Sequence, residues 1–163
     1  MNVYQLLEYD AWATSKLLEA LESLSPEQFV QENASPLSSV RQQFVHLLSV
    51  TDRYRARLAK EPAPDVSPES FATPQDVIAY NAQMRLRLSD FIKKIDQESS
   101  GQDVEHLTRK GVFRATIGQT LLHMVNHATY HRGQVACLLK FYGVDFADTD
   151  FIIWINQVDQ SKT

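Results

Sequence analysis

Three of the five histidines in this chain lie in the stretch HMVNHATYHRGQ, where His123, His127 and His131 recur every four residues. Each residue of an α-helix advances by about 100°, so the three imidazoles would share one face. Two histidines at positions i and i+4 can reach one metal ion. All three cannot, because His123 and His131 would lie about 12 Å apart along the axis, whereas a Zn–N bond is only about 2.1 Å long. A metal site here needs a ligand from another helix, and the spacing alone leaves both neighbouring pairs open.

The other helical histidine, His46, is the candidate for that ligand. It lies in the apolar run QQFVHLLSV, so we expect it to face the core, where an imidazole without a polar partner is costly to bury. A core histidine bonded to a backbone carbonyl is the alternative interpretation. His106, beside Glu105, is expected at the surface. Cys137 projects away from the histidine face and is expected to be a small core residue.

Other helical metal chemistries fit the sequence less well. A di-iron bundle needs Glu-x-x-His motifs, and none occurs. Residues 127–131 read HATYH and lack the glutamate of the His-Glu-x-x-His metalloproteases. A single cysteine excludes an internal disulfide and a multi-cysteine zinc site. We therefore hypothesise three neutral imidazoles with an open fourth position, a site that would lower the pKa of a bound water or thiol.

Composition and charge limit the partners of the chain. Its 163 residues suit a single domain, residues 1–163, and its 44% hydrophobic and 22% charged content is typical of globular proteins. The net charge of −4 argues against a nucleic-acid partner, and we interpret the basic run RYRARLAK, residues 53–60, as a solvated helix face. The N-terminus does not resemble a signal peptide, and no apolar run approaches the ~20 residues that span a bilayer. We expect a cytoplasmic protein without a membrane partner.

Apolar residues at three- and four-residue steps predict a helical protein. Four long amphipathic segments joined by linkers are typical of an all-α four-helix bundle. A small hairpin is predicted in VEHLTRKGVFRATIG, and a short C-terminal helix in FIIWINQV. The proline-rich linker EPAPDVSPES is long enough to cross the bundle end, which allows an up-down-down-up order. The long helices are expected from Val3 to Leu24, from Ser38 or Ser39 to about Lys60, from Thr73 to about Gln97, and from Thr116 to about Tyr142.

Polar residues mark where these helices begin and end. Ser39 with Gln42, and Thr116 with Gln119, have the spacing of capping boxes. Gly143 fits the position just past the last long helix. A short turn is expected to begin at Ser25 with Pro26, and Asp148 or Asp150 is expected to cap the short C-terminal helix.

These segments together resemble a known family. HMVNHATYHRGQV followed by LLKFYGVDFADTDFIIW is similar to the C-terminal signature of the DinB-like (damage-inducible DinB/YfiT-type) metalloenzymes, and YDAWATSKLLEAL and SVRQQFVHLLSVTDRYRARLAK resemble the family's first two helices. The resemblance implies an up-down-down-up bundle in which His46, His127 and His131 hold a divalent ion, zinc or nickel. It leaves His123 as a neighbour one turn away. It also implies a homodimer, and some relatives are transferases or isomerases that use a low-molecular-weight thiol.

Further side chains are candidates for the surroundings of the site. Gln134 lies near the azimuth of His127 and Tyr130 about 60° from it, and both would orient a ligand or support the histidines. Tyr9 and Trp12 either line a pocket or form ordinary aromatic core. We expect a metal-dependent hydrolase or a thiol-dependent transferase acting on a small molecule. A non-catalytic metal-binding or stress-response protein is the alternative, because no carboxylate or further base is evident near the histidines, and catalytic residues stay unassigned.

Overall fold

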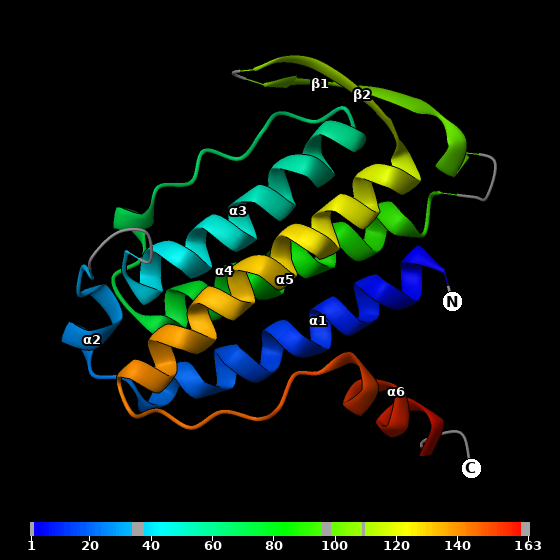
Figure 1. Ribbon diagram of the computed structural model, residues 1–163. Coiled ribbons are helices and arrows are strands. Elements are labelled where there is room, and N and C mark those ends of the chain that lie inside the picture. Colours follow the sequence, from blue (N-terminus) through cyan, green and yellow to red (C-terminus); the bar gives the residue numbers. More distant parts are fainter. Residues whose placement is uncertain (1, 34–37, 96–98, 109, 161–163) are drawn as a thin grey trace.

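Four long helices run side by side in the computed structural model, which describes residues 2–33, 38–95, 99–108 and 110–160 (Figure 1). They are α1 (Val3–Ala20), α3 (Val40–Leu58), α4 (Pro74–Ile92) and α5 (Ile117–Phe141). Shorter elements are α2 (Pro26–Val30), α6 (Phe151–Gln160), the 3₁₀ segments Leu21–Ser23, Pro68–Ser70 and Ser99–Gly101, and the strands β1 (Asp103–Thr108) and β2 (Gly111–Thr116). No helix in the described part of the chain is long and apolar enough to cross a membrane.

The apolar stripes of the long helices meet in one core. Leu17 of α1, Leu47 of α3, Met84 of α4 and Leu138 of α5 are each at most 1% exposed. Burying an aliphatic side chain of this size stabilises a fold by about 1.5–3 kcal/mol. The helical periodicity read from the sequence therefore identified the faces that pack together.

Side-chain caps fix most of the helix starts. The capping box of Thr116 and Gln119 is present in full, and Ser25 forms one with Gln28. The box expected at Ser39 is only half formed. The Gln42 N–H donates to Ser39 Oγ at 3.1 Å, but the Gln42 side chain donates to Glu32 Oε1 at 2.7 Å.

The helix ends also differ in places from expectation. α1 tightens into the 3₁₀ segment Leu21–Ser23 before Leu24. α4 ends at Ile92, short of the predicted end near Gln97, which itself lies outside the described residues. After α5 the chain turns at Gly143, whose φ of +72° is the left-handed conformation that glycine adopts without strain.

The predicted hairpin is present and extends from the start of α5 back over α3 (Figure 1). β1 and β2 pair antiparallel, with His106 opposite Phe113 and Glu105 opposite Arg114. Because successive side chains of a strand point to opposite faces, His106 and Phe113 share the face toward the bundle. The fold is therefore a mainly helical bundle with one small sheet in the described part of the chain.

The basic run on α3 is not the fully solvated face that its sequence suggested. Arg55 is 5% exposed, and its Nε donates to Asp52 Oδ1 at 2.9 Å. Asp52 is itself fully buried and also accepts from Tyr80 Oη at 3.1 Å and from Arg87. The expectation was wrong for Arg55 because a carboxylate on its own helix neutralises it, which a count of cations does not reveal.

Candidate metal centre

Three histidine rings from two helices meet at the boundary of α3 and α5. One ligand-competent atom from each of His46, His127 and His131 lies within 4.8 Å of the other two. The ring centroids are 4.4 Å apart for His127 and His131, 4.5 Å for His46 and His131, and 5.3 Å for His46 and His127. The structure thus brings α5's second and third histidines, rather than its first, to the histidine of α3.

His46 is exposed and does not face the core, contrary to expectation. Its neighbours Val45 and Leu47 supply the buried contacts, at 1% and 0% exposure, while the histidine emerges at the groove between α3 and α5. His127 and His131 are half-buried. The cluster is therefore reachable from solvent, which a ligand set in the core would not be.

The imidazoles are held in their neutral form. Burial, and then the charges of His131 and His46, lower the pKa of His127 to about 4. Desolvation by surrounding atoms likewise lowers the pKa of the half-buried His131 below the ordinary value. The ring of His46, although exposed, is partly desolvated by its neighbours, and this and the charge of His131 lower its pKa too. Neutral imidazole is the form that binds a metal ion, so these shifts leave ring lone pairs available at neutral pH.

Gln43 supports one of the rings. Its Oε1 lies 3.0 Å from His131 Nδ1 and accepts a hydrogen bond from it, so Nε2 would be the nitrogen of His131 left to bind an ion. The Gln43 side chain is only 7% exposed. Sequence reasoning missed this residue, although it lies three positions before His46 and therefore on the same side of α3.

A divalent ion fits this donor set. Around a tetrahedral zinc with bonds of about 2.1 Å, ligand nitrogens lie about 3.4 Å apart. One ring nitrogen from each of the three histidines lies within 4.8 Å of the other two, so small side-chain rotations would bring them to that separation. His127 Nδ1 is buried and has no hydrogen-bond partner in the described ranges. An unsatisfied buried nitrogen costs free energy that a bound partner would recover.

The predicted neighbours of the site lie at different distances from it. The His123 ring is 6.1 Å from that of His127 and 5.1 Å from that of Tyr54, so it lies outside the three-histidine cluster. Tyr130 is 66% exposed, with its ring 5.1 Å from that of His131. Gln134 Nε2 lies 3.5 Å from Tyr130 Oη.

Tyr9 and Trp12 belong to an aromatic group that ties α1 to the C-terminal segment. The Tyr9 ring lies 5.0 Å from that of Phe151 and 6.0 Å from that of Trp154, and its hydroxyl donates to the Thr149 carbonyl at 2.9 Å. Trp12 joins at 6.2 Å from Tyr9. No aromatic or hydrogen-bond contact of these two residues within the described ranges reaches the three histidines.

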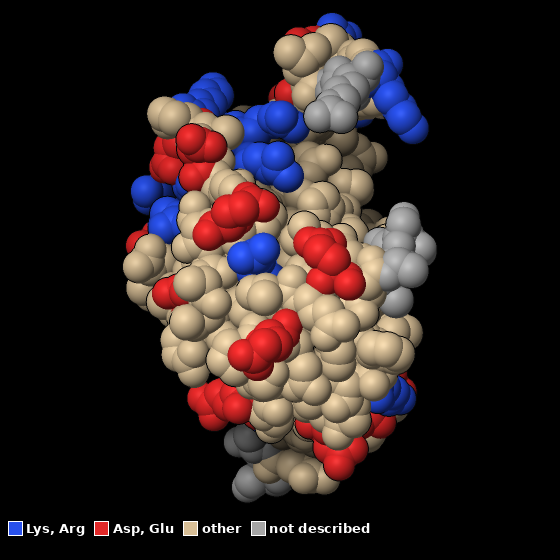
Figure 2. All heavy atoms as spheres, turned by 90° about the vertical axis from the view of Figure 1, so that its left-hand side faces the viewer, with Lys and Arg blue, Asp and Glu red and all other residues tan. Residues whose placement is uncertain are grey.

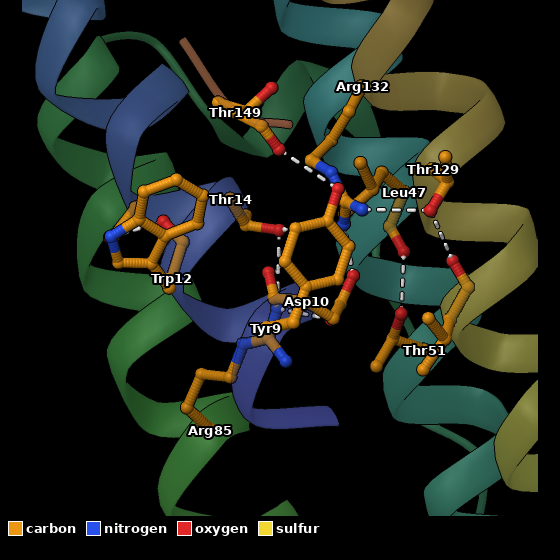
Figure 3. Close-up of polar contacts among 12 residues, drawn as sticks. Tyr9, Asp10, Trp12, Thr14, Leu47, Thr51, Arg85, Thr129, Arg132 and Thr149 are labelled. Atoms are coloured by element: carbon orange, nitrogen blue, oxygen red, sulfur yellow. Dashed lines mark hydrogen bonds and ion pairs between the residues drawn. The ribbon is translucent and has the colours of Figure 1, made fainter. Parts of the chain in front are cut away.

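A buried charge cluster fixes the helix turn that carries His131 (Figure 3). Arg132 of α5 forms an ion pair with Asp10 of α1, and Arg85 of α4 binds the other Asp10 oxygen at 2.7 Å. Arg132 Nη2 also donates to Thr129 Oγ1 at 2.8 Å. Three helices are thereby joined one residue away from a histidine of the cluster.

Two adjoining hollows open beside the histidines, under the hairpin. The first, of about 300 Å³, is lined by Arg53, Arg57, His123 and His127 among others. The second, of about 360 Å³, is lined mainly by apolar surface that includes Phe113. His123 and Tyr54 line both hollows, so the two lie side by side, and the first also reaches His127.

His106 is buried in the wall of the second hollow and is not a surface residue, contrary to expectation. Arg57 Nη1 lies 3.2 Å from its Nδ1, which must accept because arginine only donates. Its Nε2 then carries the proton and donates to Thr120 Oγ1 at 3.0 Å. Thr120 in turn donates to the Thr116 carbonyl at 2.9 Å. Burial and the positive charge of Arg57 lower the pKa of His106. The ring therefore stays neutral, with Nδ1 as the acceptor and Nε2 as the donor.

Comparison with known sequences identifies relatives over nearly the whole length. The model of the DinB family matches residues 1–159. Protein DinB of Bacillus subtilis (strain 168) is 24% identical over 167 aligned positions, which cover 98% of this chain and 96% of that protein.

Solved structures share the fold at lower identity. A DinB-like protein from Bacillus cereus ATCC 10987 has a TM-score of 0.73 at 13% identity, covering 90% of this chain and 94% of that one. YfiT from Bacillus subtilis, described as a probable metal-dependent hydrolase with an unusual four-helix bundle topology, has a TM-score of 0.65 at 17% identity, covering 88% and 89%. A mycothiol-dependent maleylpyruvate isomerase has a TM-score of 0.57 at 15% identity, covering 83% of this chain and 61% of that one.

Proposed function

Because this chain belongs to the DinB family, we propose that it is a metal-dependent enzyme in which His46, His127 and His131 hold a divalent ion, zinc or nickel. The observation that carries the proposal is the meeting of three neutral imidazoles from two helices around one point. Bound there, the ion would supply Lewis acidity that lowers the pKa of a water or thiol. The residues of the chain hold the ligand rings neutral and orient His131 through Gln43.

The surroundings of the cluster favour catalysis over a purely structural role. Structural zinc sites are closed by four protein ligands, whereas catalytic sites keep a position open. In the described part of the chain the cluster has three members, and a hollow lined by His127 adjoins it. A small-molecule substrate that enters the hollow would therefore approach the ligand set directly.

The reaction class follows from the nucleophile that the site would activate. Activated water corresponds to a hydrolase, which the likeness to YfiT supports. An activated low-molecular-weight thiol corresponds to a transferase or isomerase, which the likeness to the mycothiol-dependent isomerase supports. We further propose that the chain acts as a single domain over residues 1–163, in the cytoplasm and as a homodimer.

The up-down-down-up order of the long helices is part of the same proposal. The ring of His46 contacts that of His131, and the ring of Tyr54, later on α3, contacts that of His123, earlier on α5. This order is expected if α3 and α5 run in opposite directions. The segment after α3 runs back along the bundle before α4 begins (Figure 1), as expected if α3 and α4 run in the same direction.

Metal analysis of matched variants tests the proposal. We expect purified protein to bind about one zinc or nickel ion per chain, and His127→Ala to weaken that affinity at least about 100-fold. His123→Ala, one turn away, is the control and should retain it. Absence of stoichiometric metal in the wild type, or equal affinities in the two variants, would show that the three-histidine site is wrong.

A cobalt-substituted sample separates catalysis from a structural role. If a fourth position is open, added small thiols or anions should change the cobalt absorption spectrum. A spectrum that no such ligand alters, together with a large loss of thermal stability on chelation, would favour the non-catalytic alternative.

A further inference from the structure

Two arginines beside the histidine cluster lack a carboxylate partner. Arg53 and Arg57 lie one turn apart on α3 and are exposed, and neither forms an ion pair with any described residue. The chain has 20 acidic residues and 16 lysines and arginines. There are therefore enough carboxylates to pair with every cation, and a shortage of them does not explain the two unpaired arginines. By contrast, carboxylates pair with Arg55, Arg85, Arg87, Arg114 and Arg132.

Both arginines line the same hollow as His127. Arg57 uses Nη1 to support His106 and lies over the Tyr54 ring, with Cζ 5.6 Å from the centroid. These contacts hold its position and leave other N–H groups for a ligand. Figure 2 shows Lys and Arg side chains gathered on the part of the surface next to the projecting hairpin.

The adjoining hollow has the opposite character. Phe113 and Ala115 face it from β2, and Tyr54 faces it from α3. Phe113 is 52% exposed, although it points toward the bundle. A large aromatic side chain left half-exposed on the inner face of a hairpin is a surface that an apolar ligand would cover.

We propose that the two hollows form one binding site for an anionic amphipathic small molecule. Its carboxylate or phosphate group pairs with Arg53 and Arg57, and its aromatic or aliphatic body packs against Tyr54, Phe113 and Ala115. Hollows of this size are typical of sites for small ligands. This inference names a substrate class for the metal site proposed above. Any reaction of the bound molecule rests on that proposed function, whereas its binding depends only on these arginine and apolar side chains.

Binding of three probes to the metal-free and the metal-loaded protein tests this site. The probes are 4-phenylbutyrate, phenethyl phosphate and the neutral 4-phenylbutyramide, measured by titration calorimetry or ligand-detected NMR. We expect at least one of the two acids to bind about tenfold more tightly than the amide, since a charge-assisted contact is lost in the amide. Comparing the two acids identifies the preferred head group.

Four substitutions, one of them a control, separate the charged half of the site from the apolar half. Arg53→Gln should remove the advantage of the acid, about tenfold, without affecting the amide. Arg114→Gln is the control, because Arg114 is on the hairpin but pairs with Glu105. Phe113→Ala should weaken acid and amide alike. Arg57→Gln should act as Arg53→Gln does, but Arg53 is decisive because Arg57 also supports His106.

The outcomes are distinct from those of the metal experiment. If the acids bind no better than the amide at millimolar concentrations, or if Arg53→Gln and Arg114→Gln behave alike, the anionic site is wrong even when the protein binds zinc. If the arginine-dependent binding is found in a protein that binds no metal, this inference stands and the proposed metal function fails.

Discussion

Asp10 of α1 and Arg132 of α5 form an ion pair inside the bundle, with side-chain exposures of 3% and 4%. Arg85 of α4 shares the same carboxylate, so one aspartate connects three helices. The arginine directly follows His131, so the pair anchors to α1 the turn of α5 that carries this ring. The stability of the bundle and the geometry of the cluster thus depend on a common contact.

Removal of the Asp10 charge should destabilise the protein strongly. In Asp10→Asn the buried Arg132 and the partly buried Arg85 lose their counter-charge. Breaking one partner of a buried pair costs about 3–5 kcal/mol. Urea denaturation measures the loss. Glu19→Gln removes a member of the exposed Lys16–Glu19 pair and should change the free energy of unfolding by less than about 0.5 kcal/mol. Similar losses in the two variants would contradict the role given to the buried pair.

Gln43 should matter for metal affinity, whereas its neighbour Gln42 should not. Gln43→Leu leaves His131 Nδ1 without its acceptor, and loss of such a supporting contact weakens metal binding by about 10–100-fold. Gln42→Leu is the matched control, because Gln42 bonds to Glu32 instead. Competition with a zinc chelator measures both affinities. If Gln43→Leu binds zinc as tightly as Gln42→Leu does, the hydrogen bond does not orient the ligand.

His106 should make the metal-free protein sensitive to acid. Its pKa is lowered by burial, then by Arg57 and by the facing His123. The unfolded chain therefore takes up a proton near pH 6.5, while the folded protein resists doing so. The stability contributed by neutral His106 is complete above that pH and is lost as the pH falls toward the lower folded-state pKa.

Comparison with His106→Gln isolates this effect. The variant has no proton to take up, so the wild type should lose stability more steeply, by up to about 1.4 kcal/mol per pH unit, within that window. Urea denaturation at a series of pH values between about 7.5 and 4.5 provides the two curves. Parallel curves would mean that His106 titrates alike in the folded and unfolded states.

Two glycines of the C-terminal region should respond in opposite ways to alanine. Gly133 lies within α5 with open space where a Cβ would be, so Gly133→Ala should stabilise the protein by about 0.5–1 kcal/mol. Gly143 has equal space but a φ of +72°, so Gly143→Ala should destabilise it by about 1 kcal/mol. Thermal melts of both variants measure the shifts. A loss of stability in Gly133→Ala would indicate a need for glycine that the described contacts do not explain.

Local signals in the sequence predicted most of the architecture. The apolar periodicity identified the four long helices, and the Thr116 and Gln119 pair identified the start of α5. Helix geometry also required a ligand from beyond α5 and directed attention to His46, which the structure brings to His127 and His131. The helices, the cap and the pairing of His127 with His131 depend on the spacing of residues within one helix, and that spacing can be read from the sequence.

Features that depend on contacts between distant elements were missed. Nothing near Asp10 in the sequence indicates that it pairs with Arg132 on another helix. His106 looked solvated because its partners, Arg57 and Thr120, belong to other elements. Cys137 was expected in the core and is exposed, because a small residue at the edge of an apolar stripe can lie on either side of it.

His46 and the two histidines of α5 are separated along the chain by the linker, α4 and the hairpin. The three rings meet only where α3 and α5 pack against each other. A partly folded molecule in which α3 and α5 have not docked offers at most the His127 and His131 pair. If the cluster binds an ion as proposed, capture at full affinity therefore requires α3 and α5 to have docked, and an ion bound earlier would have only the His127 and His131 pair.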